Sequence, residues 1–136
     1  MTRVGWGLAA ICLVLIGVVG CRGGGQIYQV KDAPIQTASG KELSMDDVRK
    51  EIVAAGVAAG WQMLAPTPGE IVGTLNIRSH QAVVSIPYTA KSYSILYKDS
   101  KNLKYDEAGQ TIHENYAGWI QRLDGAIRSR LAAAGN

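Results

Sequence analysis

The fold of this chain is decided by residues Trp61–Tyr105, which read WQMLAPTPGEIVGTLNIRSHQAVVSIPYTAKSYSILYKDSKNLKY. Apolar and polar residues alternate through this stretch, as they do in strands that bury one face. Turn-forming residues interrupt the alternation four times, at Pro66–Gly69, Ser79–Gln81, Thr89–Lys91 and Asp99–Asn102. Four consecutive antiparallel strands are therefore predicted.

The same alternation predicts which side chains share the buried face of these strands. They are Ile71, Gly73, Leu75 and Ile77 on the second strand, Ala82, Val84, Ile86 and Tyr88 on the third, and Tyr93, Ile95 and Tyr97 on the fourth. A sheet with one apolar face needs a second layer to cover that face.

A helix is predicted over Met45–Ala59, before the strands. Ser44 can cap its first turn, and Asp47 stands three residues later in the capping-box position. Gly56 and Gly60 form a GxxxG pattern, which we interpret as a close approach of this helix to the sheet. The apolar stripe of the helix consists of Met45, Val48, Ile52, Ala55, Gly56 and Ala59.

A second helix is predicted to begin near Thr111, where Thr111 and Glu114 make another capping-box pair. Its apolar stripe consists of Ile112, Tyr116, Trp119, Ile120, Leu123, Ile127 and Leu131. The width of this stripe implies that the helix packs on the sheet.

A first edge strand is predicted within Gln26–Ile35, although Pro34 cannot donate a hydrogen bond to a neighbour. The expected fold is therefore one α+β domain over residues 26–136. It has an antiparallel sheet of four or five strands with two helices on one face, in the order (β)-α-β-β-β-β-α. The order resembles that of TATA-binding-protein-like folds, an analogy that carries no function.

Residues 1–21 read MTRVGWGLAAICLVLIGVVGC, with a cation at Arg3 and an apolar run before the cysteine. This is the layout of a secretory signal peptide, here covering residues 1–20. Val18-Val19-Gly20-Cys21 resembles the bacterial lipobox, which implies cleavage after Gly20 and acylation of Cys21 with chains such as palmitate. The alternative is an uncleaved single span in the inner membrane.

The residues after the cleavage site are expected to hold the domain close to a membrane. Cys21–Gly25 is predicted to be a lipidated, glycine-rich tether that reaches on the order of 15 Å. Arg22 follows the lipidated residue, where an aspartate would resemble an inner-membrane retention signal. We therefore expect the outer membrane, facing the periplasm. Cys12 would leave with the signal peptide, so the mature chain would contain no internal disulfide.

Composition argues against nucleic acid as a partner. The chain has 136 residues and a net charge of +3, and cleavage would remove Arg3 and leave 13 basic and 11 acidic residues. These basic residues form no run of the kind that follows a phosphate backbone.

Motifs for enzymatic chemistry are missing from the sequence. His113–Ala117 begins like the zinc motif HExxH, but Ala117 stands where the second histidine is needed. The pattern places His80 in a turn and His113 in a helix, with nothing to bring them together. No GxSxG, P-loop or complete GxGxxG motif is present. We therefore expect neither a metal, nor a cofactor, nor an enzyme.

The aromatic residues are the one group of side chains in the sequence that suggests binding of a partner or ligand. Since the chain lacks Phe, Tyr and Trp must also build its core. The candidate surface for a partner or ligand consists of Tyr88, Tyr93, Tyr97, Tyr116 and Trp119.

Two stretches resemble a group of small proteobacterial envelope lipoproteins that have no established activity. They are SYSILYKDSKNLKYD (Ser92–Asp106) and TIHENYAGWIQRLDGAI (Thr111–Ile127). The resemblance implies an envelope lipoprotein of α+β type and, among site residues, only the lipidated Cys21. We expect a non-enzymatic binding or structural module whose partner is an envelope protein or cell-wall material. The alternative is a carrier of a small apolar ligand between the sheet and the C-terminal helix.

Overall fold

The computed structural model describes residues 24–135, so the predicted signal peptide and the lipobox Val18–Cys21 lie outside the described residues. In this part of the chain the order of elements confirms the α+β prediction. The elements are β1 (Gly25–Gln26), β2 (Val30–Pro34), α1 (Met45–Ala58), β3 (Gln62–Thr67), β4 (Glu70–Ile77), β5 (His80–Pro87), β6 (Ser92–Lys101), β7 (Thr111–Ile112) and α2 (Asn115–Ala133).

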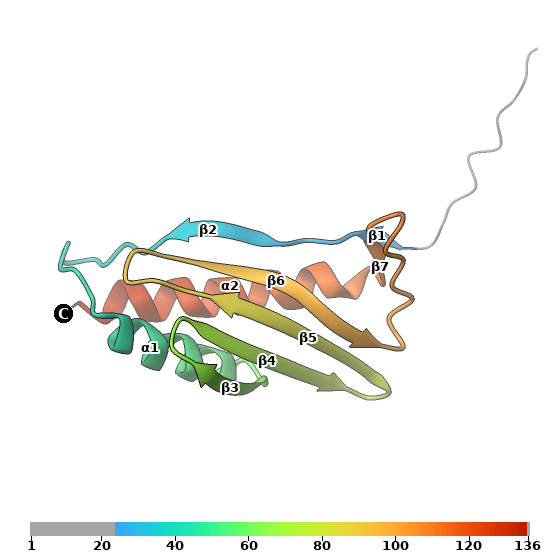
Figure 1. Cartoon of the computed structure of the whole chain (residues 1–136), viewed down its shortest axis with the longest axis horizontal. Coiled ribbons are helices and arrows are strands. Elements are labelled where there is room, and N and C mark those ends of the chain that lie inside the picture. The colour runs from blue at the N-terminus through green and yellow to red at the C-terminus, as the bar shows by residue number, and fades with distance from the viewer. Residues whose placement is uncertain (1–23, 136) are drawn as a thin grey trace, which may run out of the picture.

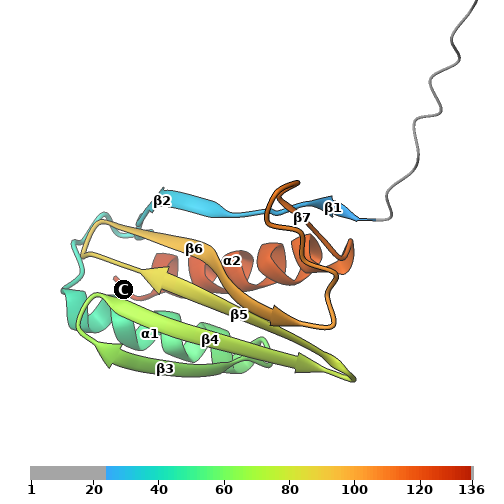
Figure 2. The same cartoon turned by 45° about the vertical axis from the view of Figure 1, so that its right-hand side comes forward.

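Five strands form one antiparallel sheet in the order β2-β6-β5-β4-β3, while β1 and β7 pair separately. Both helices lie on the same face of the sheet (Figure 1), and the view in Figure 2 shows the same two-layer arrangement. The domain therefore has its core between one sheet and one layer of helices.

Period-two alternation correctly predicted the inner face of the sheet. Ile71 on β4 pairs with Ile86 on β5, and both are fully buried. The same face continues through Val84 to Ile95 on β6, which is 1% exposed.

Two turns differ from the prediction, because β5 already begins at His80 and β6 continues to Lys101.

Helix α1 begins as its cap predicted: the Asp47 N–H donates to Oγ of Ser44 over 3.1 Å. Its second half lies close to β3, since a Cβ on Gly56 would stand only 2.3 Å from Sδ of Met63. Gly60 follows the helix with φ +91°, a conformation that favours glycine. Met45 was predicted to lie in the apolar stripe, but it is 42% exposed. It is the first residue of the helix, and its terminal methyl group lies beside Gly69 in the β3–β4 turn.

The predicted start of the second helix was also wrong. Thr111 and Ile112 form β7 and pair with β1, so α2 begins only at Asn115. Glu114 makes no side-chain capping bond. The Asn115 N–H instead donates to Nδ1 of His113 over 3.2 Å. Strand pairing with a distant segment has therefore overridden a local capping pattern.

The amino-terminal part of the domain joins the fold earlier than the tether prediction assumed. Gly25 is already paired with Ile112, so Gly25 belongs to a strand. The predicted strand over Gln26–Ile35 is interrupted after Gln26 and resumes as edge strand β2, with an irregularity around Asp32 at φ 48°. Among residues 24–135, no helix is both long enough and apolar enough to cross a membrane.

Candidate functional site

The structure places the five predicted aromatic residues in two environments. Tyr88, Tyr93 and Tyr116 are 5%, 1% and 0% exposed, so their rings are part of the core. Tyr97 and Trp119 are half-buried and pack against the edge of that core. The five residues therefore do not form one continuous outer surface.

The space considered for an apolar ligand, between the sheet and α2, is occupied by side chains of the core. They include Val84 and Ile86 from the sheet and Ile120, Leu123 and Ile127 from α2, all fully buried.

Two of the buried tyrosines carry a hydroxyl inside the core. Burial raises the pKa of Tyr116, and its hydroxyl is the one buried side-chain group without a hydrogen-bond partner in the described residues. Burial and a hydrogen bond to Asp124 raise the pKa of Tyr93. Both hydroxyls therefore stay protonated at neutral pH.

His80 and His113 lie together, contrary to the expectation that nothing joins them. Their ring centroids are 5.4 Å apart, and the Trp119 ring centroid is 6.4 Å from that of His80. The segment after β6 folds back along the sheet, where the His113 N–H donates to the Leu103 carbonyl over 2.8 Å. This return of the chain brings His80, the first residue of β5, beside His113, which lies two positions before α2.

Hydrogen bonds to the backbone orient both imidazole rings. His80 Nδ1 lies 2.7 Å from the Asn102 carbonyl oxygen, which can only accept, so this nitrogen carries a proton. His113 Nδ1 accepts the Asn115 N–H, so this nitrogen carries none. In their neutral forms, His80 therefore presents Nε2 as an acceptor and His113 presents Nε2–H as a donor.

Uncharged polar groups complete this site. Nδ2 of Asn102 donates to Oγ of Ser79 over 2.9 Å, which joins the β4–β5 turn to the end of β6. Beyond Trp119 lies a hollow of about 40 Å³ lined by Ala59, Trp61, Leu75, Ile77, Trp119 and Arg122. We call Ser79, His80, Asn102, His113 and Trp119 the histidine cluster.

Trp119 was one of the predicted binding residues, but no signal in the sequence joined it to the two histidines. The members of the cluster come from the β4–β5 turn, the end of β6 and the region around the start of α2. Within the described range 24–135, no three His, Cys, Asp or Glu side chains gather as they would around a metal ion.

Larger hollows lie beside the β3–β4 turn and the β5–β6 turn. Both turns are at the opposite end of the sheet from the β4–β5 turn (Figure 1). One of about 410 Å³ includes Met45, Pro66 and Tyr88 in its wall, and another of about 540 Å³ includes Leu43 and Lys91.

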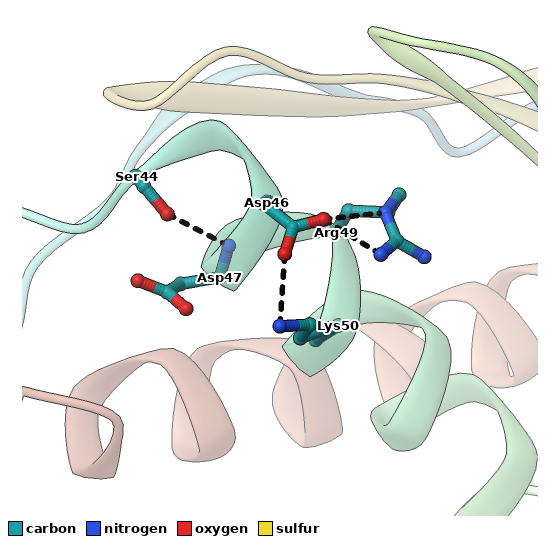
Figure 3. Close-up of polar contacts among 5 residues, drawn as sticks. All are labelled: Ser44, Asp46, Asp47, Arg49 and Lys50. Carbon is teal, nitrogen blue, oxygen red and sulfur yellow. Dashed lines mark hydrogen bonds and ion pairs between the residues drawn. The ribbon is translucent and has the colours of Figure 1, made fainter.

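Asp46, in the wall of the first of these hollows, is held by two cations. Its carboxylate lies 2.7 Å from Arg49 Nη2 and 2.8 Å from Lys50 Nζ (Figure 3). The hydrogen bonds from Lys50 and Arg49 lower the pKa of Asp46 to about 2. Asp46 and Asp47 both lie in the first turn of α1, where negative charge offsets the helix dipole.

Comparison of the chain with protein-family models, curated proteins and solved structures found no match. The histidine cluster is the site where polar and aromatic side chains from three distant segments meet, and it is our candidate functional site.

Proposed function

We propose that this chain is a lipid-anchored protein of the cell envelope, a non-enzymatic module that binds its partner close to the membrane. The observation that carries the proposal is the short distance in sequence between the acylation motif and the folded domain. Cys21 stands three positions before Gly24, and Gly25 is already paired with Ile112. A durable lipid anchor on Cys21 would therefore hold the domain itself at the bilayer surface.

The position of the histidine cluster supports binding near the membrane. An added Cβ on Gly24 would lie 3.2 Å from the Ile112 carbonyl oxygen, and His113 is the next residue. Three extended residues reach about 10 Å, so the cluster would lie at the tethered end of the domain. Figure 1 shows β1, β7 and the β4–β5 turn at that same end.

The fixed rings of the cluster support ligand binding. Each imidazole is held by a backbone group, Asn102 C=O in one case and Asn115 N–H in the other. Rigid donors and acceptors of this kind recognise a ligand with little loss of side-chain entropy.

Metabolic labelling with palmitate tests the anchor. We expect Cys21→Ser to abolish the label and to leave the precursor uncleaved, because the thiol is the acyl acceptor. Cys12→Ser is the matched control, since Cys12 lies within the predicted signal peptide and should leave labelling unchanged. Normal labelling of the Cys21→Ser protein would overturn the lipoprotein assignment.

Incubation of the purified lipidated protein with envelope substrates tests the non-enzymatic part of the proposal. We expect binding without turnover. Turnover of any such substrate, lost when His80 or His113 is replaced, would show that the cluster is catalytic.

A further inference from the structure

We propose that the histidine cluster binds a saccharide, whose hydroxyl groups bond to His80 and His113 while one face of the sugar ring lies against Trp119. This names a ligand class for the binding module proposed above. The inference rests on that proposal only for the location of the ligand near a membrane.

The two ring nitrogens that the backbone leaves free are complementary. In the neutral rings, Nε2 of His80 accepts a hydrogen bond and Nε2–H of His113 donates one. A hydroxyl group both donates and accepts through a single oxygen, so it satisfies this pair. Two neighbouring hydroxyls on a sugar ring satisfy it equally well.

The distance between the rings suits such a ligand. With centroids 5.4 Å apart and planes inclined by 43°, the rings are close but not in face-to-face contact. Hydrogen bonds of about 2.7–3.0 Å from one or two hydroxyl oxygens span a separation of this size.

The other members of the cluster, which are aromatic or uncharged, also suit a saccharide. Trp119 is half-buried beside His80, with its ring inclined by 47° to the imidazole. Its indole offers an apolar face to the C–H groups of a sugar and a polar N–H tip. Ser79 and Asn102 add a hydroxyl and an amide without formal charge.

The same tautomers disfavour a metal ion or a phosphate. A metal ion shared by the two rings needs a lone pair on both Nε2 atoms, but His113 carries its proton there. A fully ionised phosphate group offers acceptors only, so it leaves the Nε2 acceptor of neutral His80 without a donor. Arg122, a cation, belongs to the adjoining hollow rather than to the cluster.

Nuclear magnetic resonance of the imidazole nitrogens tests the inference directly, because His80 and His113 are the two histidines of the chain. The protein is produced from its complete gene with ¹⁵N-histidine, purified from membranes or the soluble fraction without a histidine tag, and held in a detergent that has no sugar head group. Without ligand, we expect one ring protonated at Nδ1 and the other at Nε2. Two rings of the same tautomer would overturn the proposal.

Binding is then measured with soluble N-acetylhexosamine oligomers and cell-wall glycan fragments, and separately with vesicles that contain or lack a glycolipid. We expect both Nε2 signals to shift and saturate with a Kd on the order of 1 mM, or tighter. A shift with soluble glycans indicates cell-wall material, and a shift only with glycolipid vesicles indicates a lipid head group. No saturable shift in either arm, or saturation by Zn²⁺ alone, would refute saccharide binding.

Variants at the two histidines separate recognition from folding. His80→Asn keeps a side-chain N–H for the Asn102 carbonyl and removes Nε2. His113→Asn keeps an acceptor for the Asn115 N–H and removes the Nε2 donor. We expect each to weaken binding at least tenfold, with thermal unfolding close to that of the parent. Tyr105→Leu, which alters an aromatic residue outside the cluster, is the control and should bind normally.

The two proposals fail in different experiments. Saccharide binding by a protein that incorporates no palmitate would reject the lipid anchor and leave the saccharide site in place. Palmitate labelling without saccharide binding would reject the saccharide site and leave the lipid anchor in place.

Discussion

The hydroxyl of Tyr93 donates a hydrogen bond to Oδ1 of Asp124, which joins β6 to α2 inside the domain. Tyr93 is 1% exposed and Asp124 is 9% exposed, so the bond is largely shielded from water. Oδ2 of the same carboxylate accepts from Nε of Arg128 over 2.9 Å, one helical turn further along α2. A buried carboxylate on a helix is stabilised here by a donor from the sheet and a cation from its own helix.

Tyr93→Phe is expected to lower the free energy of unfolding by about 1–3 kcal/mol, because it removes a donor from a buried charged group. Urea denaturation monitored by circular dichroism measures this loss. Tyr97→Phe is the matched control, since Tyr97 is half-buried and its hydroxyl bonds to Ser100, and we expect a smaller loss. Equal effects of the two substitutions would contradict a special role for the Tyr93–Asp124 bond.

Gly56→Ala is expected to destabilise the domain by about 1 kcal/mol, although alanine favours helices more than glycine does. The added methyl group would stand 2.3 Å from Sδ of Met63, a half-buried side chain that also approaches Gly73. Thermal unfolding measures the net effect.

Gly118→Ala supplies the comparison for Gly56, because a Cβ at Gly118 in α2 meets nothing within 4 Å. This change is expected to stabilise the domain by about 0.5–1 kcal/mol through helix propensity alone. Opposite signs at the two glycines are the expected result. Stabilisation at both would mean that Met63 moves aside without cost.

Ser44→Ala is expected to cost about 1 kcal/mol, since it removes the acceptor for the Asp47 N–H at the start of α1. Glu114→Ala should change stability by less than about 0.5 kcal/mol, because exposed Glu114 makes no capping bond in α2. Chemical denaturation of both variants distinguishes the observed cap from the capping box that the sequence suggested. A larger loss for Glu114→Ala would contradict the observed start of α2.

The carboxyl group of Asp46 is expected to titrate with a pKa of about 2, below the ordinary value of 3.8. Because the folded-state pKa is lowered, the stabilising ion pairs are present above pH 3.8 and are lost as the pH falls through about 2. Carboxyl ¹³C resonances measure this titration. Replacing Arg49 and Lys50 together by Gln should return the pKa of Asp46 towards 3.8, and an unchanged value would exclude the two cations as its cause.

Several elements were predicted from sequence because they depend on neighbouring residues. The inner face of β4 follows from alternation between Ile71 and Leu75, and the start of α1 follows from Ser44 and Asp47. The close approach at Gly56 followed from a small-residue pattern, although its contact Met63 did not. Alternation and capping are local, so a stretch of a few residues contains the information.

The candidate site could not be predicted in the same way. His80 and His113 belong to separate strand and helix patterns in the sequence, and these patterns give no distance between the two residues. Their 5.4 Å separation depends on the return of the chain after β6 and on the pairing of β7 with β1. That pairing also moved the start of α2 beyond Thr111, where the local capping pattern had placed it.

The sequence by itself determined the α+β class, the inner face of the sheet and the cap of α1. Tertiary structure decided the start of α2, the burial of Asp124 between a strand and a helix, and the meeting of His80 with His113. The physical reason is the range of the interactions. Periodicity and capping act over a few residues, whereas strand pairing and side-chain packing join segments that are far apart in the chain. Pairing and packing override local preferences when they bury more surface and satisfy more backbone groups.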